Sequence, residues 1–130
     1  MTQCKDAGFT LIELMVVMAI AALGIALVTP NMIRAYDNFK VSVEERRLAE
    51  LLGEVRMKAF LRSTAYTVQL KNNVFRVKDG GGEVEFACIT FPPQEFTVNE
   101  HGFANLKQIQ YRTIGNADVK TMDNGADGVW

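Results

Sequence analysis

Hydrophobic and polar residues divide the chain into a long apolar run, an amphipathic segment and a series of short alternating stretches. The apolar run extends from Phe9 to Met32 and contains a single charged residue, Glu13. It exceeds the ~20 apolar residues that a helix needs to cross a bilayer. The pattern therefore predicts a membrane-spanning helix close to the N-terminus.

Two other N-terminal signals fit this run less well. A secretory signal peptide has an apolar core of about 7–15 residues followed by a small-residue cleavage site. Here the small residues Ala7-Gly8 precede the run, and Pro30-Asn31-Met32 follows it. A lipoprotein anchor at Cys4 would need an apolar segment before the cysteine, and the sequence has none there.

The run continues into an amphipathic helical segment. Beyond Pro30, apolar residues recur mostly at intervals of three and four, which is typical of one helix face: Tyr36, Phe39, Val43, Leu48, Leu51, Leu52, Val55, Ala59 and Phe60. The other faces are charged and include Glu54 and Lys58 in the favourable i, i+4 order. We expect one helix over residues 9–63, with a bend at Pro30, which cannot donate to the helical ladder. A soluble domain should cover the apolar stripe.

Residues 64–130 have the period of two that is typical of strands. Asn72-Asn73 predicts a tight turn between the first two strands, Asp79-Gly80-Gly81-Gly82 predicts a flexible break, and Pro92-Pro93 should end the third strand. The expected strands are "AYTVQL", "VFRV", "VEFACITF", "EFTVN", "QIQYRTI" and "DVKTM". The simplest way to bury both apolar faces is an α+β fold, in which an antiparallel sheet packs on the second half of the long helix.

Glu13 is the residue that most needs an explanation. An ionised carboxylate in hydrocarbon costs roughly 2.5–3.5 kcal/mol on insertion scales, so an intramembrane acid indicates a functional site. The run itself contains no cation. Cleavage after Gly8 would create an α-amino group at Phe9, about one helical turn from Glu13, in the same or a neighbouring chain. The alternative is an acid close enough to the interface to snorkel or to be protonated.

The stretch "GFTLIELMVV", which begins at Gly8, resembles the processing site of class III signal peptides in type IV pilins and type II secretion pseudopilins. The resemblance implies that residues 1–8 are a leader removed by a prepilin peptidase, that the amine of Phe9 is methylated, and that Glu13 supports assembly by pairing with the Phe9 amine of an adjacent subunit. It also implies a long N-terminal rod with Gly24 and Pro30 as its weak points.

The same resemblance implies the partners and the location. The partners would be other pilin or pseudopilin subunits, the prepilin peptidase, an inner-membrane assembly platform and, before assembly, membrane lipid. The protein would be a single-pass bacterial inner-membrane protein with an extracytoplasmic soluble domain, which later enters a pilus or pseudopilus. Residues 9–32 would form the membrane span and then the filament core. The resemblance does not distinguish a subunit of a type IV pilus from a subunit of a type II secretion pseudopilus.

A finer resemblance covers "RMKAFLRSTAYTVQLKNNVFRV", residues 56–77, and "FTVNEHGFAN". These segments are similar to the GspH/FimT branch of minor pilins and pseudopilins. The basic Gly-Arg-x-Arg motif associated with DNA-binding members is absent near the C-terminus, and Arg112 has no such neighbours. A structural minor subunit is therefore the preferred hypothesis, and the alternative is a minor pilin whose soluble domain binds DNA or another ligand.

Charge and cysteine content narrow the hypotheses further. The formal net charge is −1, so bulk charge does not favour nucleic acid as a partner. The two cysteines are Cys4 and Cys88. Loss of the leader would leave Cys88 alone and would exclude an intrachain disulfide. Because Cys88 lies in a β-like apolar run, we expect a buried structural thiol rather than a reactive one.

The remaining candidate sites are weak. His101 is the only histidine, and a turn residue is a better interpretation than a catalytic or metal-binding one. The stretch from Asp123 to Gly128 resembles the start of a calcium loop but lacks a distal glutamate. Scattered strand cations favour a solvated face over a nucleic-acid patch: Lys71, Arg76, Lys78 and Lys107. We expect no metal, no cofactor and no catalytic constellation.

Overall fold

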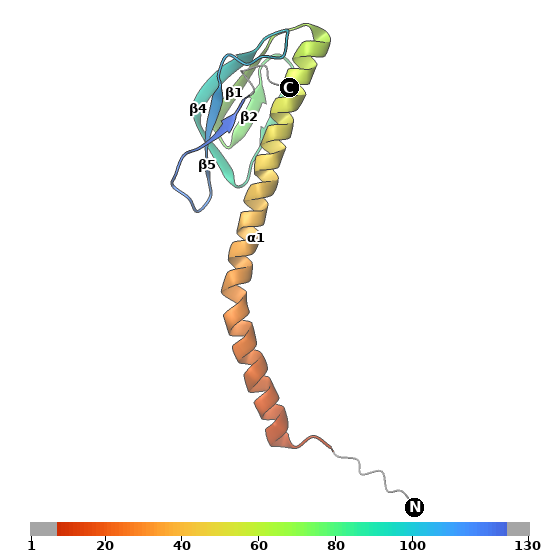
Figure 1. The fold of residues 1–130 in the computed structure, drawn as a ribbon, viewed down its shortest axis with the longest axis vertical. Coiled ribbons are helices and arrows are strands. Elements are labelled where there is room, and N and C mark those ends of the chain that lie inside the picture. Colours follow the sequence, from red (N-terminus) through yellow and green to blue (C-terminus); the bar gives the residue numbers. More distant parts are fainter. Residues whose placement is uncertain (1–7, 125–130) are drawn as a thin grey trace, which may run out of the picture. The chain divides into compact units, whose positions relative to one another are not determined.

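The computed structural model describes residues 8–124 of the chain. It contains one helix and six strands (Figure 1): α1 (Leu11–Arg62), β1 (Tyr66–Asn72), β2 (Val74–Val77), β3 (Gly82–Glu85), β4 (Ile89–Val98), β5 (Gln108–Thr113) and β6 (Lys120–Asp123). The strands form an antiparallel sheet in the order β3-β2-β1-β4-β5-β6. The predicted α+β fold, with a long N-terminal helix packed on an antiparallel sheet, is confirmed.

The chain divides into two compact units, one ending at Asn38 and the other beginning at Phe39. The first unit contains the apolar part of α1, whose large side chains are exposed. The most apolar 18-residue window of the helix has a mean hydropathy of 2.7. By length and composition, the helix can therefore cross a membrane. The helix continues through Pro30 without interruption, so the bend expected there stays a prediction.

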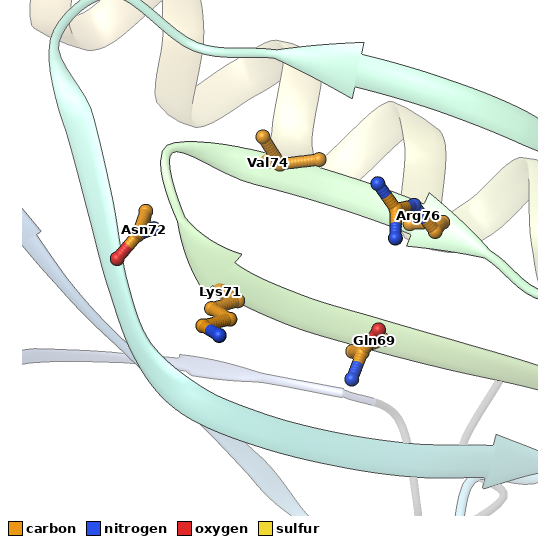
Figure 2. Close-up of a pocket in the computed structure, with 5 residues that line it drawn as sticks. All are labelled: Gln69, Lys71, Asn72, Val74 and Arg76. Atoms are coloured by element: carbon orange, nitrogen blue, oxygen red, sulfur yellow. The ribbon is translucent and has the colours of Figure 1, made fainter.

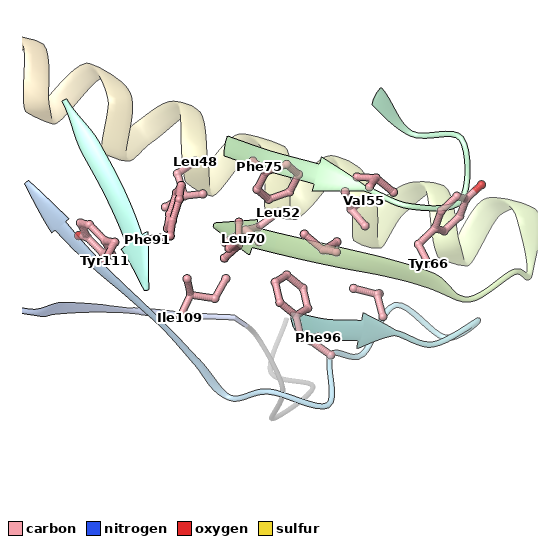
Figure 3. Packing of buried hydrophobic residues seen from close by; sticks show 14 of the residues in the cluster. Leu48, Leu52, Val55, Tyr66, Leu70, Phe75, Phe91, Phe96, Ile109 and Tyr111 are labelled. Carbon is pink, nitrogen blue, oxygen red and sulfur yellow. The ribbon is translucent and has the colours of Figure 1, made fainter. Parts of the chain in front are cut away.

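The second unit has its core between the sheet and one face of α1 (Figure 3). The buried helix residues are Leu48, Leu52, Val55 and Ala59. They pack in one cluster with strand residues such as Phe75 and Phe96. Burying each large apolar side chain contributes about 1.5–3 kcal/mol, so this cluster holds the sheet on the helix.

The apolar stripe expected along the second half of the helix is only partly correct. Other members of that stripe are exposed: Tyr36, Phe39, Val43 and Phe60. With about 100° per residue, Phe39, Val43 and Phe60 lie about 100° or more around the helix from the buried Ala59. The prediction from spacing alone combined residues of two different faces of α1 into one stripe. The sheet covers only the face that carries Leu48 and Leu52.

The predicted turn between the first two strands is confirmed. Lys71 pairs with Val74, so Asn72 and Asn73 form a two-residue connection. Asn72 adopts a positive φ of 55°, a conformation that asparagine tolerates better than most residues. The glycine-rich stretch that follows forms the loop of a second hairpin, because Val77 pairs with Gly82 directly across it.

The expectation of one strand over "VEFACITF" is wrong. The structure divides it into β3 and β4, with residues 86–88 between them. β3 lies at one edge of the sheet and β4 beyond β1, so the chain must cross the end of the β1–β2 hairpin at this point. Asn73 and Phe86 secure the crossing, because the Phe86 N–H donates to the Asn73 carbonyl at 2.8 Å and the Asn73 side-chain amide donates to the Phe86 carbonyl at 3.2 Å.

Pro92-Pro93 does not end a strand, contrary to prediction. Both prolines lie inside β4, which also includes residues 95–98 of the stretch expected to be a separate strand, "EFTVN". The register shows why this is possible: Leu70 pairs with Gln94 but Asn72 pairs with Phe91, so two prolines face one residue of β1. A bulge removes ladder hydrogen bonds that proline could not donate.

Candidate functional site

Gly8, Phe9 and Thr10 precede the helix, and all three are exposed. Glu13 follows in the first turn of α1 and is also exposed. Its carboxylate makes no ion pair with any of residues 8–124. The helix start therefore combines an accessible Gly8–Phe9 bond with an acid that has no cationic partner in the part of the chain that the structure describes.

Thr10 also belongs to this site, although it was not predicted from the sequence. The Glu13 N–H donates to Thr10 Oγ1 at 3.3 Å, and the Leu14 N–H donates to the Thr10 carbonyl at 3.2 Å. Thr10 is thus the N-cap of α1. The signal was available, because Thr-x-x-Glu before an apolar run is the capping-box pattern.

The capping geometry also gives Glu13 a local source of stabilisation. A carboxylate in the first turn of a helix interacts favourably with the positive end of the helix dipole, typically by about 0.3–1 kcal/mol. This is smaller than the cost of roughly 2.5–3.5 kcal/mol for an ionised acid in hydrocarbon. A formal positive charge near Glu13 is still needed to stabilise the ionised acid in an apolar environment.

The helix flank beyond Glu13 offers an apolar surface. A hollow of about 300 Å³ is lined by Gly24, Ile25, Val28, Thr29 and Met32. The Thr29 hydroxyl donates to the Ile25 carbonyl at 2.7 Å, so its polar group is already satisfied within the helix. Small residues such as Gly24 allow close approach of helices within membranes. This flank can therefore accept lipid or another apolar helix.

A second hollow, of about 260 Å³, lies over the β1–β2 hairpin (Figure 2). It is lined by Gln69, Lys71, Asn72, Val74 and Arg76. Gln69 pairs with Arg76 and Lys71 with Val74 in the strand register, so these four side chains share the sheet face opposite the core. The hollow is open, and four of its five lining residues are polar or charged.

The basic residues of this sheet face are partly neutralised. Arg76 pairs with Glu83 at 2.8 Å, and Lys78 pairs with Glu95 at 2.6 Å. Because both pairs are about half exposed, each contributes little to stability. They do lower the positive charge that this face could present to a phosphate backbone, which makes it a poor match to a nucleic-acid surface.

Two neighbouring acids of α1 hold the sheet from the helix side. Glu44 accepts hydrogen bonds from the backbone N–H groups of Ala87 at 2.8 Å and Cys88 at 2.7 Å. Glu45 accepts from the Tyr111 hydroxyl at 3.0 Å and is paired with Lys120, also at 3.0 Å. Glu44 therefore contacts the β3–β4 crossing, and Glu45 contacts strands β5 and β6.

The Glu44 contact also explains the position of Cys88. The N–H of Cys88 is bound to a carboxylate outside the sheet, so Cys88 lies in the crossing and not in a strand. Its side chain is partly exposed rather than buried. The expectation of a buried strand thiol is therefore wrong.

The contact with Glu45 has a measurable consequence for Tyr111. Burial, the hydrogen bond to Glu45 and the negative charge of Glu45, in that order, raise the pKa of Tyr111 from 10.0 to about 12. Because the neutral phenol is favoured in the folded state, its contribution to stability is complete below pH 10 and is lost as the pH rises from 10 to 12.

We expect the ultraviolet absorbance difference between the wild type and Tyr111→Phe to show a phenol that titrates near pH 12. Glu45→Gln should lower this midpoint, because it removes the negative charge, whereas Glu50→Gln on an exposed part of the same helix should not. A Tyr111 midpoint near 10 in the folded wild type would contradict the contact.

The other candidate residues form no site in the described chain. His101 lies in an exposed turn, as expected, with its Nε2 3.6 Å from Glu100. Asn99 builds this turn by accepting the N–H groups of His101 and Phe103. Residues 8–124 contain no group of three or more His, Cys, Asp or Glu side chains arranged to hold a metal. The resemblance to a calcium loop lies largely outside the described residues, beyond Asn124.

The sequence comparisons agree with the geometry of the helix start. Residues 4–29 match the profile described as the prokaryotic N-terminal methylation motif. No curated protein and no solved structure shows significant similarity to the chain. The matched segment contains Gly8, Phe9 and Glu13. The chain thus carries the signal of type IV pilins and pseudopilins at the start of a helix that packs on an antiparallel sheet, which is a pilin-like fold.

Proposed function

We propose that this protein is a minor pilin or pseudopilin, a structural subunit that assembles into a type IV pilus or a type II secretion pseudopilus. A prepilin peptidase cleaves the chain after Gly8 and the new amine of Phe9 is methylated. Glu13 then pairs with the Phe9 amine of an adjacent subunit. The observation that carries this proposal is an exposed Glu13 that makes no ion pair with any of residues 8–124 and lies inside the methylation motif and an otherwise uncharged apolar run.

The physical basis of assembly is the exchange of lipid for protein contacts. Residues 9–32 leave the inner membrane for a bundle of similar helices, where helix packing replaces lipid packing. The charge of Glu13 is costly in hydrocarbon, and an amine beside it offsets this cost. The soluble domain stays on the extracytoplasmic side. Within the superfamily, the GspH/FimT branch is our assignment, on the resemblance of residues 56–77.

The test is the intact mass and N-terminal sequence of the protein from cells with and without an active prepilin peptidase. We expect a mature chain that begins at methylated Phe9 only when the peptidase is active. In the same cells, Glu13→Ala should be processed normally. It should enter filaments at least about tenfold less, because the Phe9 amine of the adjacent subunit would then be a charge without a partner.

The control is Glu50→Ala, which removes an acid from the aqueous half of the same helix. It should not affect processing. An unprocessed N-terminus in both strains would mean that the apolar run is an ordinary membrane anchor, and the assembly role of Glu13 would be abandoned.

A further inference from the structure

The last two strands of the sheet present a separate surface on the side away from α1. β5 and β6 are drawn in blue in Figure 1. Tyr111 and Lys120 pair across them, and both contact Glu45 of the helix. Successive side chains of a strand point to opposite faces. The next residues toward the loop, Arg112 and Val119, therefore lie on the face away from the helix, and both are exposed.

An exposed isoleucine extends this surface. The Ile114 N–H donates to the Cys88 carbonyl at 2.9 Å, which continues the pairing of β4 with β5 by one residue beyond Thr113. Because Thr113 is buried, the alternation places Ile114 on the same face as Arg112. Ile114 is 65% exposed and Val119 is 45% exposed. We call Arg112, Ile114 and Val119 the outer patch.

The loop between β5 and β6 holds the outer patch in a defined geometry. The Asn116 N–H donates to the Thr113 carbonyl at 3.1 Å, and the Asp118 N–H donates to Asn116 Oδ1 at 3.0 Å. Gly115 supplies the positive φ of 83° that the turn uses. A partner would therefore meet a surface that is already ordered, which lowers the entropic cost of binding.

The charge of Arg112 gives the outer patch a preference for acids. Arg76 of β2 and Lys78, the residue after β2, each pair with a glutamate. Arg112 makes no ion pair with any of residues 8–124, and its neighbour across the strand pair with β4 is the uncharged Thr90. A carboxylate from another molecule would therefore meet a cation that no acid of the described chain neutralises.

β6 also offers its backbone to a further strand. Within residues 8–124 it is the last strand of the sheet. The Asn124 N–H donates to the Lys107 carbonyl, next to β5, at 2.8 Å. In an antiparallel pair, residues whose backbone groups face the neighbouring strand alternate with residues whose groups face away. The N–H and carbonyl groups of Thr121 and Asp123 therefore point away from β5, toward the outer edge of β6.

We propose that β6 and the outer patch bind an extended segment of a partner protein, which adds a strand beyond β6 and carries an acidic and an apolar side chain at alternate positions. Strand addition takes its affinity from backbone hydrogen bonds and its specificity from alternate side chains. Strands lie about 4.8 Å apart, so Arg112 would be about 10 Å from the added strand. An arginine and a glutamate side chain together span this distance over Val119, and the apolar side chain lies against Ile114.

A short synthetic peptide serves as the probe, with Val, Glu and Val at every second position and Thr between them. It is added to the full chain in mild detergent, and the backbone amide signals are followed by NMR. We expect a Kd below about 1 mM, with the largest shifts at Thr121 and Asp123. No shift at these residues with the peptide at several times that concentration would overturn the proposal.

Thr121→Pro tests the added strand. Proline lacks the N–H that would donate to the peptide, but this N–H faces away from β5, so the β5–β6 pairing should survive. The affinity should fall at least about fivefold through the lost backbone hydrogen bond. The matched control is Thr121→Val, which keeps the N–H and should bind as the parent does. Equal affinities for the two variants would mean that no strand is added at β6.

A charge exchange tests the role of Arg112. Arg112→Gln should lower the affinity about two- to fivefold, whereas Arg76→Gln, on the same sheet but already paired with an acid, should leave it unchanged. Arg112→Glu should prefer a peptide in which Lys replaces the Glu. If Arg112→Glu binds both peptides equally, the outer patch does not select an acidic segment and the proposal is wrong.

Two other occupants of the β6 edge give different results. Slow amide exchange at Thr121 and Asp123 in the monomer without peptide would show that another part of the same chain occupies the edge. Protection that rises with protein concentration would show that a second copy occupies it, and either result would overturn the proposal. The contact goes beyond the proposed function, because it uses neither Gly8 nor Glu13. Its failure therefore leaves that function standing.

Discussion

Leu52→Ala is expected to lower the free energy of unfolding of the soluble domain by about 2–5 kcal/mol, the range for a leucine truncated in a closely packed core. Leu52 is 2% exposed and lies between α1 and the sheet (Figure 3). The loss has two parts, the missing burial of the side chain and the cavity left where the helix and the strands cannot collapse onto each other. The measurement is urea unfolding of the mature chain in mild detergent, followed by near-ultraviolet circular dichroism.

Leu61→Ala is the matched control, because it is the same substitution in the same helix. Leu61 is 72% exposed, and surface substitutions away from special features are usually within about 0.5 kcal/mol. Equal losses for both variants would show that the wrong face of α1 had been assigned to the core. A smaller loss than 2 kcal/mol for Leu52→Ala alone would mean that the domain repacks around the gap.

The fold class was predictable because its determinants are local. An apolar run followed by a helical period, and then by alternating stretches, indicates a long helix and a sheet. The Asn72-Asn73 turn was predictable for the same reason, since asparagine tolerates the positive φ that the turn uses. Glu54 and Lys58 form the expected i, i+4 pair at 2.7 Å.

The errors have a common physical origin in contacts between residues distant in sequence. Nothing local shows that the chain crosses the sheet at residues 86–88, because the acceptor for Ala87 and Cys88 is Glu44, more than 40 residues away. The prolines of β4 are tolerated by a bulge that depends on the register with β1.

The helix start shows the opposite case. Gly8, Phe9 and Glu13 were proposed from the sequence because their roles would depend on a short continuous motif; the profile match covers that motif, and the roles themselves stay predictions. Thr10 was missed although its pattern is equally local. The capping contact to Glu13 needed only the Thr-x-x-Glu spacing that precedes an apolar run.

The contact between Glu44 and the β3–β4 crossing leads to the second large effect. Glu44→Ala removes the acceptor of two backbone N–H groups, and an unsatisfied buried donor costs about 1–3 kcal/mol. Water can reach Ala87, which is exposed, whereas the bond to Cys88 is partly buried. We therefore expect a loss of about 1–3 kcal/mol in total, together with faster amide exchange at residues 87 and 88.

Cys88 gives this prediction a local readout. Its thiol is partly exposed in the crossing, and release of the backbone by Glu44→Ala should increase its rate of alkylation by a maleimide. Glu44→Gln should have an intermediate effect, because the amide oxygen can accept one N–H group while the amide nitrogen, a donor, faces the other. Glu50→Ala removes an exposed acid from the same helix and should change neither stability nor alkylation. If Glu44→Ala left both the unfolding curve and the alkylation rate at the wild-type values, the carboxylate would not be what holds the crossing against the helix, and the packing in this region would rest on the apolar cluster alone.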